Sequence, residues 1–143
     1  MVFGWIVYRS RPIETPWPDV IPDIIRSSEH WNAADGITGM LLYSKDTYLQ
    51  YIEGEAEPLS ELWRDLELDK RHRIIWSRQG EREDRQFGKL AMGYFDGNRE
   101  TSAVQDWQIW RRRYEWPETD ADELMRLLLT VAQEKYPQAA ITP

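Results

Sequence analysis

ITGMLLYSKDTYLQYIEG, residues 37–54, is the stretch that decides the fold. Two runs rich in aliphatic and aromatic residues flank the polar pair Lys45-Asp46, a pattern typical of two strands joined by a tight turn. Alternate side chains of a strand share a face, so the amide of Gln50 lies among apolar neighbours of the second strand. Burying an amide costs free energy unless a partner takes its hydrogen bonds. The hairpin therefore predicts a polar partner for Gln50 in the core.

The segment before the hairpin, residues 18–34, has the pattern of an amphipathic helix whose apolar face ends in polar residues. Its stripe at helical spacing consists of Ile21, Ile24, Ile25, Ser28 and Asn32. Asp35-Gly36 is a helix C-terminal signal. Because this helix and the hairpin each direct an amide into one core, we predict a polar, aromatic ligand between them.

The remaining segments complete an alternating order of strands and helices. In chain order we predict a strand over 2–8, a loop over 9–18, the helix over 18–34, the hairpin over 37–53, a helix over 57–68, and strands over 72–77 and 89–95. This β-α-β-β-α-β-β order is the split βαβ, or ferredoxin-like, pattern with one strand added. The predicted fold class is α+β.

Both faces of the predicted sheet are apolar, so both need a cover. In the first strand Ile6 and Tyr8 point to one face, while Trp5 and Val7 point to the other. The two predicted helices can cover one face only. We expect the C-terminal segment to cover the other face.

The C-terminal segment predicts two helices, over 99–115 and 119–135. The second carries apolar residues at helical spacing, and Thr119 with Asp122 forms a capping pair at its start. We expect these two helices to be all that follows the sheet.

Composition limits the class of protein. The chain has 143 residues, enough for one domain, with no cysteine and a net charge of −7. The acidic balance argues against binding to nucleic acid or anionic membranes. A chain without cysteine suits the reducing cytoplasm, which is the expected location. The sequence has neither a signal-peptide pattern nor an apolar run of membrane-spanning length, so no membrane partner is expected.

Motifs for common enzymatic chemistries are absent or weak, and we expect no enzyme. His30 and His72 are the only histidines and lack metal-ligand spacing, so no metal is expected. Glu53, Glu55 and Glu57 fit a solvated loop better than a catalytic carboxylate pair. No nucleophile motif or glycine-rich phosphate loop occurs.

Four polar side chains and one methionine are not explained by the motifs considered so far. They are Tyr8, Ser28, Asn32, Gln50 and Met92. On a ferredoxin-like frame these residues converge between the helices and the sheet, and Met92 is expected to share a face of the fifth strand with Leu90. They could bind a ligand, or they could form a buried polar network that joins helix to sheet.

Several motifs follow one another in the order and spacing of a known family. The blocks are Ile6-Val7-Tyr8-Arg9-Ser10, Ser28-x-x-x-Asn32-x-x-x-Gly36-Ile37-Thr38-Gly39, Leu41-Leu42-Tyr43, Leu49-Gln50-x-Ile52-Glu53-Gly54, Asp69-x-Arg71-His72 and Arg85-x-Phe87-x-x-Leu90-x-Met92-Gly93. Together they resemble the BLUF domain, a flavin-binding blue-light photoreceptor module. On this resemblance residues 1–97 are the flavin-binding domain and residues 98–143 a helical extension packed on the sheet.

The resemblance implies a noncovalent flavin, usually FAD with FMN or riboflavin as alternatives, between the two helices over one sheet face. Tyr8 matches the photoactive tyrosine, and Gln50 matches the glutamine between that tyrosine and the flavin. Asn32 matches the residue that hydrogen-bonds the carbonyl edge of the flavin. Ser28 and Met92 match positions that line the pocket.

Other cofactor-binding positions carried over from the family are Arg64, Arg71, His72 and Leu90. Leu90 stands where relatives often have tryptophan, a position associated with output and with competing electron transfer. Trp31, Glu29 and Asp65 also depart from the usual residues. The two carboxylates would weaken binding of a diphosphate arm, and the two arginines would offset them.

The implied function is a photoswitch. Excitation of the flavin triggers reversible proton-coupled electron transfer with Tyr8, and the hydrogen bonds of Gln50 rearrange, which shifts the absorption to the red. We expect a stand-alone photoreceptor, a homo-oligomer or the partner of an unidentified protein, with the aromatics between 107 and 116 as candidate contacts. Two alternatives remain: a flavin-free protein-interaction module, and an acylphosphatase-type enzyme that uses Arg9 and Asn32.

Overall fold

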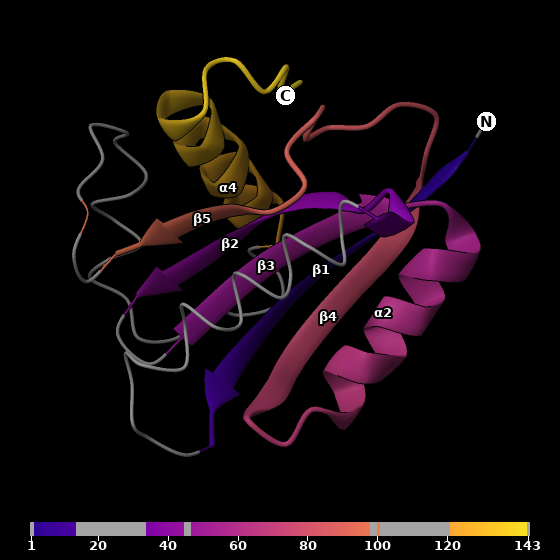
Figure 1. Cartoon of the computed structure of the whole chain (residues 1–143). Helices are drawn as coiled ribbons and strands as arrows, with labels where there is room; N and C mark the ends of the chain where they lie inside the picture. Colours follow the sequence, from indigo (N-terminus) through magenta and orange to yellow (C-terminus); the bar gives the residue numbers. More distant parts are fainter. Residues whose placement is uncertain (1, 14–33, 45–46, 98–99, 101–120, 143) are drawn as a thin grey trace.

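The computed structural model describes residues 2–13, 34–44, 47–97, 100 and 121–142. Figure 1 shows one twisted sheet with helix α2 on one face and helix α4 on the other. The elements are β1 Phe3–Pro12, β2 Thr38–Ser44, β3 Thr47–Gly54, α2 Ala56–Leu68, β4 His72–Arg82, β5 Gly93–Asp96 and α4 Ala121–Lys135. The helices predicted over 18–34 and 99–115 lie outside the described residues, apart from residues 34 and 100.

The strands form a mixed five-stranded sheet in the order β4-β1-β3-β2-β5. β1 pairs antiparallel with β3 and β4, while β2 pairs antiparallel with β3 and parallel with β5. The hairpin of β2 and β3 lies where it was predicted. Its register with β1 places Tyr8 directly opposite Gln50. The predicted α+β, ferredoxin-like fold is confirmed.

Each face of the sheet has its own hydrophobic core. On the α2 face, the core includes Ile6, Leu41, Ile52, Leu59 and Met92. On the α4 face, it includes Val7, Leu49, Tyr51, Leu124 and Leu128. The predicted alternation of side chains along β1 and β3 is therefore confirmed, as is the cover of the second face by a C-terminal helix. Every residue of β3 is buried, so Gln50 lies in a strand that is covered on both faces.

β1 and β4 are longer than predicted. β1 continues to Pro12 and β4 to Arg82, because the two strands pair along their whole length, from Phe3 opposite Arg82 to Pro12 opposite His72. Residues 77–82 are mostly polar, so the sequence pattern did not indicate that β4 continues through them. An edge strand whose side chains reach solvent needs no regular apolar pattern.

β5 is shorter than predicted, because it begins at Gly93 rather than at residue 89. The preceding residues, 83–92, form what we call the β4–β5 loop, and the N–H of Leu90 donates to the carbonyl of Phe87 within it at 2.9 Å. Leu90 packs against the core on the α4 face, whereas Met92 belongs to the core on the α2 face. The prediction that these two side chains share a strand face is wrong.

The two described helices lie close to their predicted bounds. α2 begins at Ala56 and ends at Leu68, and α4 runs from Ala121 to Lys135. The predicted cap at Thr119 lies outside the described residues. Among the helices that the structure describes, none combines the length and the apolar character of a membrane span.

Candidate functional site

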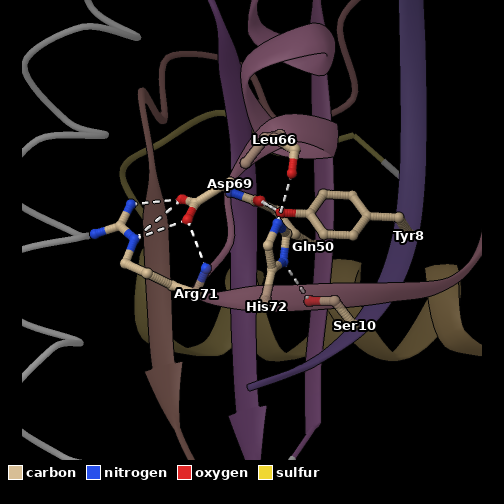
Figure 2. A network of polar contacts seen from close by, with 7 residues as sticks. All are labelled: Tyr8, Ser10, Gln50, Leu66, Asp69, Arg71 and His72. Carbon is tan, nitrogen blue, oxygen red and sulfur yellow. Dashed lines mark hydrogen bonds and ion pairs between the residues drawn. The ribbon is translucent and has the colours of Figure 1, made fainter. Parts of the chain in front are cut away.

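The centre of the candidate site is a buried pair formed by Tyr8 of β1 and Gln50 of β3. The tyrosine is 3% exposed and the glutamine 5% exposed. The hydroxyl of Tyr8 donates a hydrogen bond to Oε1 of Gln50, and Figure 2 shows the two side chains pointing toward each other. The antiparallel register brings the two residues opposite each other and directs both to the α2 face. The sheet itself therefore fixes the geometry of this pair.

The amide nitrogen of Gln50 lies 3.4 Å from the thioether sulfur of Met92. A thioether is a weak acceptor, and an amide nitrogen has two hydrogens to donate. Within the described part of the chain, Met92 is the one partner of this nitrogen. The second N–H is therefore suited to a carbonyl oxygen of a bound molecule, which fits the carbonyl edge of a flavin.

Aromatic rings surround Tyr8 on the α2 face. Its ring centroid lies 5.3 Å from that of Trp63 in α2 and 6.1 Å from that of His72 in β4. Burial raises the pKa of the Tyr8 phenol well above its ordinary value of 10.0, and the charge of Asp69 raises it further. Tyr8 is thus a neutral phenol at ordinary pH.

The buried tyrosines make the protein sensitive to alkaline conditions. Burial is the largest cause that raises the pKa of Tyr8, Tyr48 and Tyr51 above the ordinary value of 10.0. Above that pH the unfolded chain releases protons that the folded chain retains, so rising pH favours unfolding. We expect the free energy of unfolding to fall steadily above about pH 10, as measured by urea unfolding at a series of pH values. Ionisation of all seven tyrosines while the circular dichroism stays native would contradict this.

His72 joins three elements beside Tyr8, as Figure 2 shows. Its Nδ1 lies 2.9 Å from Oγ of Ser10 in β1, and its Nε2 lies 2.7 Å from the carbonyl oxygen of Leu66 in α2. A carbonyl oxygen only accepts, so Nε2 carries a hydrogen and donates it. The shift of register between Arg9 and Ser10 lies next to this contact. Both ring nitrogens thus have protein partners, and a hydrogen bond from His72 to a flavin would have to compete with them.

Arg71 forms an ion pair with Asp69 after the end of α2. Its Nη2 lies 2.6 Å from Oδ2, and its Nε lies 3.0 and 3.1 Å from the two carboxylate oxygens. The guanidinium lowers the pKa of Asp69, and the carboxylate raises the pKa of Arg71. The arginine side chain is 58% exposed, so the pair adds little to stability but holds the guanidinium in one place.

The other predicted cofactor-binding residues do not all lie beside the Tyr8–Gln50 pair. Leu90 lies in the β4–β5 loop on the α4 side of the sheet, away from the Tyr8–Gln50 pair. Arg64 is exposed on α2. Ser28 and Asn32 lie outside the described residues, as do Trp31, Glu29 and the aromatics between 107 and 116. Of the predicted set, the structure brings together Tyr8, Gln50, Met92 and His72 on one face.

Glu53 contradicts the prediction of a solvated loop, because its side chain is fully buried. Oε1 accepts from Thr38 Oγ1 at 3.0 Å and from the N–H of Phe87 at 2.7 Å. Oε2 accepts from the Tyr51 hydroxyl at 3.0 Å and from the N–H of Gln86 at 2.9 Å. Four donors compensate the burial of one carboxylate. The alternation of β3 was the available signal, since Glu53 follows Tyr51 on the buried α4 face.

A metal site has no support in the parts of the chain that the structure describes. No group of three or more histidine, cysteine or acidic side chains that could hold a metal ion occurs there.

Solved structures of other proteins share this fold. A structure of BlrB, a BLUF protein in its dark state, has a TM-score of 0.64 and 27% identity, over 93% of this chain and 89% of that one. BlsA in its photo-activated state has a TM-score of 0.73 and 21% identity, over 88% of this chain and 94% of that one. A bacterial light-regulated adenylyl cyclase has a TM-score of 0.65 and 24% identity, over 94% of this chain but 36% of that one. The comparison with curated proteins finds no match.

The family model named BLUF, sensors of blue light using FAD, matches residues 4–93. This match covers more than half of the 143 residues and spans β1 to the start of β5, including Tyr8, Gln50 and Met92. The chain belongs to the BLUF family of flavin-binding blue-light sensors. It spans just over a third of the larger light-regulated cyclase.

Proposed function

We propose that this protein is a blue-light photoreceptor whose switch is the Tyr8–Gln50 pair acting on a noncovalent flavin. The observation that carries the proposal is the hydrogen bond from the Tyr8 hydroxyl to Gln50 Oε1, with the amide nitrogen of Gln50 left to a weak acceptor. A bound flavin supplies absorption of blue light and, once excited, a strong oxidant. The residues of the chain supply the electron, the path of the proton and the hydrogen bonds that stay rearranged after excitation.

The tyrosine is placed to act as the reversible donor. Tyr8 gives up an electron together with its proton, and Gln50 Oε1, which already accepts the phenolic hydrogen, receives that proton first. The electron and proton then return, so no net chemistry occurs. Gln50 ends with its hydrogen bonds rearranged, and a stronger bond from its amide to a flavin carbonyl shifts the absorption to the red. The pair works as a two-state element rather than as a catalyst.

The cofactor we favour is FAD, the form named in the family description. The structure of Klebsiella pneumoniae BlrP1 contains FMN, so a shorter flavin is the main alternative. The proposed anchors are Asn32 and Ser28 at the ring, with Arg64 and Arg71 toward the phosphates. The fixed guanidinium of Arg71 suits an anionic group, because its exposed side can face a phosphate while Asp69 holds it.

The proposed output is a change of protein contacts. We divide the chain into a flavin-binding domain, 1–97, and a helical extension, 98–143, of which α4 packs against β2 and β5. A shift at the site would alter this packing and with it a contact to a second copy or to another cytoplasmic protein.

The visible absorption spectrum of the purified protein tests the proposal. We expect a structured flavin band that shifts slightly to the red after a blue flash and returns in the dark. Release of the cofactor by heat and its chromatography distinguish FAD from FMN and riboflavin. A protein that stays colourless after incubation with each flavin would contradict the proposal and favour a flavin-free interaction module.

A further inference from the structure

The β4–β5 loop links the two faces of the sheet, and a buried carboxylate holds its first part. Glu53 of β3 accepts the N–H groups of both Gln86 and Phe87. The loop then turns back, as Leu90 donates its N–H to the carbonyl of Phe87 and accepts the N–H of Gly39 in β2, each at 2.9 Å. The path of the loop is thus set by side-chain and backbone contacts to β3 and β2.

The same loop ends at the candidate photochemical site. Met92 is 4% exposed, and its sulfur lies 3.4 Å from the amide nitrogen of Gln50. Gln50 and Glu53 both belong to β3, but their side chains point to opposite faces. The loop therefore contacts Glu53 on the α4 face and then crosses to Gln50 on the α2 face.

A second set of contacts holds the loop from the C-terminal side. The carbonyl of Gln86 accepts the N–H of Thr142 at 2.7 Å, and the N–H of Lys89 donates to the carbonyl of Ala139 at 2.9 Å. Figure 1 shows this loop beside the C-terminal end of the chain. These bonds, with the bond from Gly39 of β2 to Leu90, would hold the loop without Glu53, so removing the carboxylate is expected to loosen the loop rather than detach it.

We propose that Glu53 is a positioning residue of the photoswitch: by fixing Gln86 and Phe87 it sets the Met92 sulfur against the Gln50 amide. A loosened Met92 gives the amide more freedom to turn back after rearrangement, so Glu53 controls how long the light-generated state lasts. The positioning part stands on the contacts of the chain alone. The lifetime part rests on the proposed photoreceptor function.

Two substitutions distinguish the positioning role of Glu53 from an effect of its buried charge on stability alone. Glu53→Gln replaces one acceptor oxygen with an NH₂ group that faces a donor, so at least one of the two backbone contacts is lost. Glu53→Asp keeps both oxygens and the charge but withdraws them by one methylene. Glu55→Gln is the matched control, because Glu55 is exposed two residues further along the chain and its side chain makes no capping hydrogen bond.

The first readout needs no light and no flavin. Methyl-labelled methionine NMR of the purified protein in the dark, with the Met92 signal assigned by its loss in Met92→Leu, reports the position of the sulfur. We expect the Met92 signal to move in both Glu53 variants and to stay in place in Glu55→Gln. Hydrogen exchange at the amides of Gln86 and Phe87 is expected to accelerate at least about tenfold in the Glu53 variants.

The second readout is dark recovery after a blue flash. We expect recovery to accelerate at least about threefold in both Glu53 variants and to be unchanged in Glu55→Gln. A parent protein without a light response would contradict the proposed function, while the NMR result would still decide the positioning role.

Three outcomes would each overturn a part of this proposal. One is a Met92 signal that stays in place in both Glu53 variants although their melting temperature falls, since Glu53 would then act on stability alone. Another is a moved signal in both variants with unchanged recovery, which would overturn the control of lifetime and leave the positioning role standing. The third is aggregation of both Glu53 variants while Glu55→Gln folds, which would make Glu53 a folding determinant.

Discussion

Tyr8→Phe is expected to bind flavin and to lose the reversible red shift altogether. The ring that packs against Trp63 and His72 is retained, so the site keeps its shape. The hydroxyl that donates to Gln50 Oε1 is gone, and with it the proton that must leave together with the electron. The measurement is the difference between light and dark absorption spectra of the purified variant, at flavin occupancy equal to that of the parent.

The control for Tyr8→Phe is Tyr43→Phe. Tyr43 is 4% exposed and belongs to the core on the same sheet face, but it lies on β2, two strands away from Tyr8. Both variants lose one buried hydroxyl, at a cost of about 1–3 kcal/mol of stability when a partner is left unsatisfied. We expect the control to keep a red shift of full size. A normal light response in Tyr8→Phe would remove Tyr8 from the mechanism.

The sheet could be predicted from the sequence because its side-chain chemistry alternates with a period of two. Ile6 and Val7, adjacent in β1, reach opposite cores, as the sequence pattern requires of a strand between two apolar layers. The same alternation along β3 placed Gln50 on the α2 face. Local pattern and tertiary environment agree in these strands, so the local pattern sufficed.

The burial of Glu53 could not be read from its neighbours in the chain. Its backbone donors, Gln86 and Phe87, come from a loop more than thirty residues later. A glutamate before a glycine and an acidic run is typical of a solvated strand end. The one signal of burial was that Glu53 shares a strand face with Leu49 and Tyr51. Alternation along a strand does not show which hydrogen-bond partners a side chain will have.

Residues 89–92, the last part of the β4–β5 loop, were predicted as strand because their apolar residues alternate. Leu90 and Met92 are two positions apart, which fits one face of a strand. Backbone bonds to Gly39 and to the C-terminal segment give this part of the chain other partners, and the two side chains reach different cores. Tertiary hydrogen bonds thus prevailed over a two-residue pattern.

Flavin binding by His72 stays a prediction, and its contacts within the protein could not be predicted from the sequence. The resemblance implies that this histidine is one of the flavin-binding residues, and in the structure its two ring nitrogens contact Ser10 and the carbonyl of Leu66. Neither partner is adjacent to His72 in the sequence, and the shift of register that precedes Ser10 has no clear signal in the chain. Which partner a ring nitrogen finds depends on packing that no single motif contains.

Gln50→Leu is the second substitution expected to abolish the light response. Leucine is close in size to glutamine and suits an apolar core, so we expect the fold and the flavin band to persist. The amide oxygen that accepts from Tyr8 and the amide nitrogen that faces Met92 are both removed. On excitation the Tyr8 phenol would then lack its proton acceptor, and no amide would remain to rearrange.

The spectrum of Gln50→Leu tests both proposed roles of the amide together, as the acceptor of the proton and as the group that rearranges. In the dark, the flavin band is expected at a different position from that of the parent, since a hydrogen bond to the flavin has been lost. After a flash, no reversible red shift should appear, whereas the control Gln79→Leu, an exposed glutamine on the edge strand β4, should respond like the parent. A full-sized, reversible shift in Gln50→Leu would mean that the red shift arises elsewhere, and that the buried Tyr8–Gln50 bond holds the sheet together without taking part in the switch.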